Sequence, residues 1–182
     1  MVRTRVGYAG GTTESPSYHR LGDHTETIQV DYDPRQITFD QLLGVFWDGH
    51  DPTCRSRSRQ YMAIVFFQDE TQRQQALASK RAREQKLGRE VHTEIRPATS
   101  FHLAEDYHQK YRLRQHREIA REYEAIYPAL KDFVDSTAAA RVNGYLAGYG
   151  TAGQLEREID ELGLSEAARR RLEEIWQRHR PR

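Results

Sequence analysis

The order of apolar and polar positions along the first hundred residues predicts strands separated by helices. Residues 2–6 and 28–32 alternate with a period of two, which is typical of half-buried strands. Residues 61–67 are continuously apolar and β-prone, which predicts a central strand covered on both faces. Residues 90–96 return to alternation. We therefore expect four strands in this part of the chain.

Helix signals lie between these strands. Thr38 followed by Gln41 forms a capping-box pattern, in which each side chain can bond the backbone N–H of the other. A helix should therefore run from about residue 39 to residue 47. Asp69 opens a second and longer helix, and Gly88 ends it because glycine readily takes the left-handed conformation found after helix ends.

The pattern becomes mixed and then helical in the last eighty residues. We expect a helix from roughly Leu103. Residues 129–150 carry glycines among tyrosines, which predicts irregular wrapping that could line a cleft. Residues 151–182 carry two apolar stripes at helical spacing on either side of Gly163, which predicts a helical hairpin. We accordingly divide the chain into a domain at residues 1–150 and a C-terminal helical hairpin at 151–182.

Composition narrows the classes of function. The 28 basic and 27 acidic residues nearly cancel to a net charge of +1, so no strong field points to nucleic acid or a membrane. The N-terminus has no apolar signal-peptide core, and no apolar run is long enough to span a bilayer, so a cytoplasmic protein is expected. Cys54 is the only cysteine, which excludes an internal disulfide and a cysteine-rich metal site.

Several polar segments could take part in catalysis or binding, although none of them alone identifies a reaction. The glycine-rich residues 7–11 lack the Lys-Ser/Thr pair of a phosphate loop and predict a tight turn instead. His24, His50 and His108 could supply a metal site, but histidines that hydrogen-bond within a fold are commoner. We expect no metal. The arginines at 169–171 predict a solvated helix face.

Eight short segments follow one another along residues 2–111. They are Val6–Gly11, Ser15–Tyr18, His24–Glu26, Tyr32–Pro34, Phe46–Trp47, His50–Thr53, Gln60–Tyr61 and Ala104–Gln109. Taken in order, they resemble successive motifs of the peptide methionine sulfoxide reductase A family. The resemblance rests on the order and spacing of the segments rather than on any one of them.

The resemblance implies both a fold and a reaction. The fold is an α+β ferredoxin-like plait with a mixed sheet, whose leading strand and helix ahead of Val2 are missing, followed by the C-terminal hairpin. Residues 1–150 then form a methionine sulfoxide reductase A-like domain that is incomplete at its N-terminus. The reaction is the thiol-dependent reduction of methionine S-sulfoxide, in oxidised proteins or as the free amino acid. The family binds no cofactor for it, and thioredoxin or another thiol serves as reductant.

Three residues match the family's site. A thiolate attacks the sulfoxide sulfur, and the oxygen is protonated as it leaves. Glu26 matches the catalytic glutamate, which needs a poorly solvated pocket to stay neutral near pH 7. Tyr18 and Tyr61 match the tyrosines whose hydroxyls hydrogen-bond the sulfoxide oxygen. From the residues alone, the favoured interpretation is instead that Glu26 is an exposed carboxylate at a strand edge, with the tyrosines as packing residues.

The chain departs from the family pattern at its cysteines. The family's nucleophile lies in a Gly-Cys-Phe-Trp-Gly motif upstream of residues 7–11, and this chain starts after that point. Cys54 matches no catalytic position and is the least favoured nucleophile, and residues 144–150 lack the usual resolving cysteine. We therefore expect a fragment or misplaced start of a reductase, and we keep a catalytically inactive binding module as the alternative. Whether the chain itself is an enzyme stays open.

Overall fold

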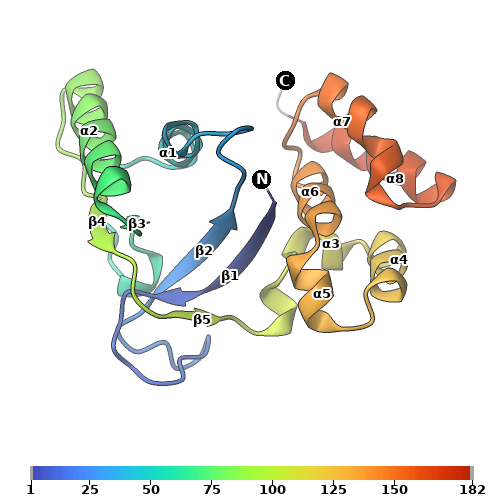
Figure 1. Cartoon of the computed structure of the whole chain (residues 1–182), viewed down its shortest axis with the longest axis horizontal. Coiled ribbons are helices and arrows are strands. Elements are labelled where there is room, and N and C mark those ends of the chain that lie inside the picture. Colours follow the sequence, from blue (N-terminus) through green and yellow to red (C-terminus); the bar gives the residue numbers. More distant parts are fainter. Residues whose placement is uncertain (1, 181–182) are drawn as a thin grey trace. The chain divides into compact units, whose positions relative to one another are not determined.

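The computed structural model describes residues 2–180, and they form two compact units. Residues 6–104 make an α/β unit, whereas residues up to Arg5 join those from Glu105 onward in a helical unit. Figure 1 gives the order of the elements along the chain. We describe each unit by itself.

The strands lie in two small sheets. β1 is central in the first, whose order is β2-β1-β5, and β3 pairs with β4 in the second. β5 runs antiparallel to β1, with Gly7 opposite Leu103, while β3 runs parallel to β4. Gly7 is required there because a Cβ atom would lie 2.3 Å from the carbonyl oxygen of His102. The strands are β1 (Arg3–Ala9), β2 (Thr25–Asp31), β3 (Ile64–Phe67), β4 (Glu94–Pro97) and β5 (Phe101–Leu103).

Two helices accompany the second sheet, α1 (Phe39–Asp48) and α2 (Glu70–Leu87); α2 packs on β3 and β4, and α1 packs on α2. The predicted capping box of α1 is confirmed, because Thr38 Oγ1 accepts from the N–H of Gln41 and the Gln41 side chain accepts from the N–H of Thr38. α2 ends as predicted at Gly88, whose φ of 62° is left-handed. The core between helices and strands consists of Leu43, Trp47, Val65, Ala76 and Val91.

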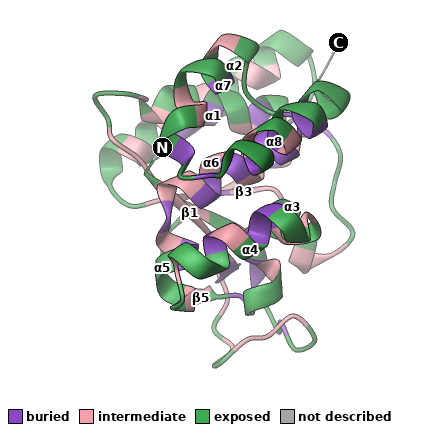
Figure 2. Ribbon diagram, turned by 90° about the vertical axis from the view of Figure 1, so that its right-hand side faces the viewer, coloured by how far each residue is buried: buried purple, intermediate pink, exposed green. Residues whose placement is uncertain are grey.

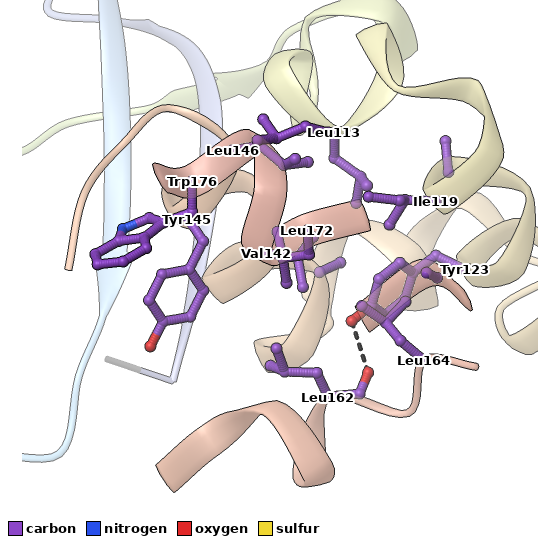
Figure 3. Close-up of a cluster of buried hydrophobic side chains, with 14 of the residues drawn as sticks. Leu113, Ile119, Tyr123, Val142, Tyr145, Leu146, Leu162, Leu164, Leu172 and Trp176 are labelled. Atoms are coloured by element: carbon purple, nitrogen blue, oxygen red, sulfur yellow. Dashed lines mark hydrogen bonds between the residues drawn. The ribbon is translucent and has the colours of Figure 1, made fainter. Parts of the chain in front are cut away.

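Six helices form the second unit around one hydrophobic core. The close-up in Figure 3 shows this core, in which the Tyr123 hydroxyl donates a 2.6 Å hydrogen bond to the carbonyl oxygen of Leu162. The bond satisfies two polar groups that would otherwise be buried without partners. The helices are α3 (Tyr111–Gln115), α4 (Arg117–Ile126), α5 (Leu130–Asp135), α6 (Thr137–Leu146), α7 (Ala152–Glu158) and α8 (Glu166–His179), and the 3₁₀ turns are Asp106–His108 and Ile159–Leu162.

The C-terminal helices predicted around Gly163 are confirmed. Ser165 caps α8 by accepting a hydrogen bond from the N–H of Ala168. Buried and exposed residues lie on opposite sides of α8, as Figure 2 shows by colour. Each large apolar side chain on the buried side stabilises the fold by about 1.5–3 kcal/mol. The buried residues are Ala168, Leu172, Ile175 and Trp176.

Two element predictions are wrong. Residues 129–150 are not irregular, because α5 and α6 occupy most of them and Ser136 caps α6 by accepting from the N–H of Ala139. No helix starts at Leu103, which ends strand β5, and the next α-helix begins at Tyr111. Pairing with β1 from the far end of the sequence overrides the local pattern there.

The apolar run at 61–67 forms a shorter strand than the pattern predicts. Tyr61, the first residue of the run, ends a 3₁₀ turn. Only Ile64–Phe67 joins the two-stranded sheet with β4. The boundary between the compact units falls after Ala104, and α7 and α8 share a core with α3 to α6. The division at 150 stays a prediction about domains.

Candidate functional site

The three residues predicted to form the site come together in the α/β unit. Tyr18 lies in the loop between β1 and β2, Glu26 lies on β2, and Tyr61 ends a 3₁₀ turn ahead of β3. The side chain of Tyr61 is hydrogen-bonded to that of Tyr18, and this bond raises the pKa of Tyr61 above its ordinary value. The negative charge of Glu26 adds to the rise in the pKa of Tyr61, so both of the other site residues act on the Tyr61 hydroxyl.

Solvent reaches this cluster. Glu26 is exposed, and the Tyr61 side chain is 61% exposed. Tyr18 is half-buried, because its ring packs against Tyr8 and the other members of a small core. The described residues therefore do not supply the poorly solvated surroundings that we expect for Glu26.

Gln60 holds the carboxylate of Glu26. Its side-chain amide donates a 2.6 Å hydrogen bond to Glu26 Oε1. Gln60 lies directly before Tyr61, so the same turn presents a hydroxyl and an amide donor to the cluster. Reasoning from residue types alone missed this role. The only signal was the place of Gln60 beside Tyr61 in the resemblance.

Arg59 fixes the turn that carries Gln60 and Tyr61. Its backbone carbonyl accepts a 2.9 Å hydrogen bond from the buried hydroxyl of Thr25, the neighbour of Glu26 on β2. Its guanidinium donates to the carbonyl oxygen of Asp23 at 3.2 Å and lies 3.8 Å from the Glu94 carboxylate on β4. These contacts join the turn, β2 and β4 in one rigid support.

A closed loop precedes Glu26. The Asp23 carboxylate accepts hydrogen bonds from the backbone N–H and hydroxyl groups of both Thr12 and Thr13, which hold the pKa of Asp23 well below its usual range. His24 is fully buried, and its Nε2 donates to the carbonyl oxygen of Thr13 at 2.9 Å while Nδ1 accepts from the N–H of Gly11. Both ring nitrogens are thus occupied by the loop, and His24 acts as a structural residue.

Cys54 is placed in a turn that keeps its thiol protonated. Its sulfur donates to a carboxylate oxygen of Asp51 at 3.3 Å. This hydrogen bond and the negative charge of Asp51 raise the pKa of Cys54. A thiolate is the nucleophilic form of cysteine, so the surroundings of Cys54 disfavour nucleophilic attack.

Histidine ligands for a metal do not gather in the described part of the chain. Between residues 2 and 180, no group of three or more His, Cys, Asp or Glu side chains is placed to hold a metal ion. Nδ1 of His50 hydrogen-bonds the carbonyl oxygen of Phe46 at 2.8 Å, so this ring caps the end of α1. The expectation of no metal stays a prediction.

Comparison with known families places this α+β chain among the reductases of oxidised methionine. A family model described as peptide methionine sulfoxide reductase matches residues 1–141. A second model, described as selenoprotein methionine sulfoxide reductase A, helical domain, matches residues 130–176. The chain belongs to the peptide methionine sulfoxide reductase family.

Relatives agree with this assignment. The chain is 40% identical over 171 residues to a peptide methionine sulfoxide reductase of Drosophila melanogaster, which covers 93% of this chain and 68% of that protein. It is 44% identical over 121 residues to a peptide methionine sulfoxide reductase MsrA 1 of a Synechocystis strain, covering 59% of this chain and 54% of the relative. The chain thus spans about half to two thirds of the length of these relatives.

Solved structures confirm the fold class. Reduced Mxr1 from Saccharomyces cerevisiae is 33% identical, with a TM-score of 0.57 over 63% of this chain and 71% of that chain. Methionine sulfoxide reductase A of Corynebacterium diphtheriae, also 33% identical, gives a TM-score of 0.53 over 64% of each chain. The predicted family and α+β class are confirmed. None of the helices among residues 2–180 is both long and apolar enough to cross a membrane.

Proposed function

We propose that this chain carries the oxygen-binding side of a site for thiol-dependent reduction of methionine S-sulfoxide, free or in oxidised proteins. The observation that supports the proposal is the convergence of Tyr18, Tyr61 and Glu26, which come from three separate segments. Two hydroxyl donors beside a carboxyl group suit a sulfoxide oxygen that gains negative charge and then a proton.

The proposed reaction has two stages. A cysteine thiolate attacks the sulfoxide sulfur, while the hydroxyls of Tyr18 and Tyr61 donate hydrogen bonds to the oxygen. Glu26 delivers a proton to the oxygen, the sulfur–oxygen bond of the sulfoxide breaks with release of water, and the cysteine and methionine sulfurs stay bonded. A water molecule then attacks the cysteine sulfur, the bond between the two sulfurs breaks, and methionine leaves as a cysteine sulfenic acid forms. Two further thiol groups, from thioredoxin or another donor, then reduce the sulfenic acid, with release of water and formation of their disulfide.

The nucleophile in this proposal comes from sequence outside the 182 residues. The thiol is the electron donor as well as the attacking group, so hydrogen bonds to the oxygen cannot replace it. Cys54 is the single cysteine of the chain, and the hydrogen bond to Asp51 raises its pKa.

A role for the reaction in protein repair under oxidative stress, in the cytoplasm, belongs to the same proposal.

An inactive binding module is the second candidate. The observation in its favour is that the one thiol of the chain is kept in its protonated form. Such a module would use Tyr18 and Tyr61 to bind the sulfoxide oxygen without reducing it. Binding of methionine S-sulfoxide with no turnover, in a protein that also includes the preceding coding sequence, would support this candidate.

The site assignment is tested in a protein extended by the coding sequence that precedes Met1. Glu26→Gln removes the proposed proton donor, so kcat for a methionine S-sulfoxide substrate should fall by about 10²–10⁴. Tyr61→Phe should lower kcat as well. The control is Tyr111→Phe, which changes an exposed tyrosine of the helical unit and should leave kcat unchanged. Equal activity of Glu26→Gln and the unmodified protein would contradict the assignment.

A further inference from the structure

A basic groove lies on the surface of the helical unit, and none of its lining residues is among those assigned to the sulfoxide site. It has a volume of about 270 Å³ and follows the first two turns of α4 beside the end of α3. Its floor is the buried Ala120, and three of its five lining residues are arginines. The lining residues are Arg114, Arg117, Ala120, Arg121 and Glu124.

Arg114 is held in a fixed position in this groove. Its Nε donates a 3.0 Å hydrogen bond to the carbonyl oxygen of Gln109, and its guanidinium lies 4.8 Å from the centre of the Phe133 ring. Glu124, the one acidic lining residue, is 3.9 Å from Arg114. The charge of Glu124 is therefore partly offset by Arg114, and the groove keeps a net positive charge.

Arg117 and Arg121 have no carboxylate partner among the described residues, although they lie one turn apart on the same face of α4. Like charges at this spacing repel each other and cost some helix stability. Other arginines in the described part of this unit pair with carboxylates, namely Arg3, Arg5, Arg141, Arg169, Arg170, Arg171 and Arg178.

We propose that this groove binds a small molecule through a phosphate monoester dianion. Guanidinium groups present paired N–H donors in a plane, which fits the oxygens of a phosphate group. Three arginines against one acidic residue leave an excess of charge that a dianion neutralises better than a monoanion does. The small volume of the groove favours a small phosphorylated molecule over a protein segment.

The test uses the 182-residue chain with phenyl phosphate as the probe and phenyl sulfate as a monoanion of similar shape. At pH 8 and 150 mM salt, phenyl phosphate should shift the NMR signals of the Arg117 and Arg121 side chains and of the α4 backbone. It should bind more tightly than phenyl sulfate, because the second phosphate proton is lost by this pH. Equal binding of the two probes would overturn the proposal.

A matched pair of double variants separates the groove from the overall charge. Arg117→Gln with Arg121→Gln should weaken phenyl phosphate binding roughly tenfold or more, because two of the three guanidinium groups are lost. Arg170→Gln with Arg178→Gln removes the same charge from the exposed face of α8 and should leave the affinity within about twofold. An equal loss in both variants would contradict a defined site.

Two further outcomes bear on the source of the phosphate. Competition by free inorganic phosphate at similar concentrations would support the phosphate chemistry of the groove. Binding to vesicles of phosphatidylcholine and phosphatidylserine, with no shift of α4 signals by phenyl phosphate, would overturn the small-molecule site in favour of a membrane surface.

The double variants should keep the circular dichroism spectrum of the parent chain, because both changed side chains of α4 are exposed.

Discussion

At the scale of single residues, the site depends on two groups that favour the neutral form of the Tyr61 hydroxyl. The hydrogen bond to Tyr18 raises the pKa of Tyr61, and the Glu26 carboxylate acts in the same direction. Gln60 holds that carboxylate through a 2.6 Å hydrogen bond. A neutral Tyr61 hydroxyl is a hydrogen-bond donor, which is the form that a sulfoxide oxygen requires.

The coupling of the two tyrosines gives a direct prediction. Tyr18→Phe removes the hydrogen bond that favours the neutral form of Tyr61, so the pKa of Tyr61 should move down toward the ordinary tyrosine value. NMR titration of the tyrosine ring carbons measures this change. The control is Tyr32→Phe, which leaves Tyr18 in place and should not move the titration of Tyr61. An unchanged Tyr61 titration in Tyr18→Phe would show that the two hydroxyls do not interact.

No local sequence pattern predicts the site residues. Tyr18 and Tyr61 lie far apart in the sequence. The residues beside them do not distinguish either one from the other tyrosines among the ten in the chain. Their hydrogen bond depends on a loop, a strand and a 3₁₀ turn that meet only in the fold. The resemblance to a family supplied these positions, whereas the role of Gln60 came from the structure. The residue type alone favours an exposed carboxylate at position 26, and Glu26 is exposed.

At the scale of elements, helix ends were the most predictable feature. Thr38 with Gln41, Asp69 and Gly88 act through hydrogen bonds within a few residues, so the sequence contains the whole signal. Strand β5 is different, because its pairing with β1 joins residues almost a hundred positions apart.

The prediction for residues 130–146, which form helices, is wrong for another reason. The glycines of this region predict an irregular chain, yet Gly144 lies within α6, where a Cβ atom would meet nothing within 4 Å. The usable signal was Ser136 followed by Thr137 and three alanines, which is a cap ahead of residues with good helix propensity.

Capping also gives a stability prediction. Thr38→Ala removes the side-chain acceptor of the α1 capping box and should lower the free energy of unfolding by about 1 kcal/mol. Urea denaturation followed by circular dichroism measures the change. The control is Thr71→Ala on the exposed face of α2, which should be neutral or slightly stabilising because alanine favours helix. Equal losses in both variants would argue against the cap.

At the scale of the whole molecule, one buried lysine ties the N-terminal residues to the helical unit. Lys110 is 4% exposed, and its Nζ donates a 2.5 Å hydrogen bond to the carbonyl oxygen of Thr4. Burial lowers the pKa of Lys110 to about 8. The negative charge of Asp135 raises this pKa, but by less than burial lowers it. The folded state therefore holds this proton less tightly than the unfolded chain does.

The lysine makes stability depend on pH. Between about pH 8 and the ordinary lysine value of 10.5, the unfolded chain binds more protons at this position, so stability should rise with pH. The rise is at most about 1.4 kcal/mol per pH unit. Lys110→Met should remove this contribution. Urea unfolding at pH 7.5 and pH 9.5 measures it, and an identical pH dependence of variant and parent would contradict the shifted pKa.

The central claim is that the tyrosines and the glutamate serve a reductase whose nucleophile lies outside these 182 residues. The most direct measurement is dithiothreitol-dependent reduction of methionine S-sulfoxide by this chain, by Cys54→Ser, and by a chain extended through the preceding coding sequence. We predict reduction by the extended chain and none by the 182-residue forms. Reduction by the 182-residue chain that is lost in Cys54→Ser would contradict the account and make Cys54 the nucleophile.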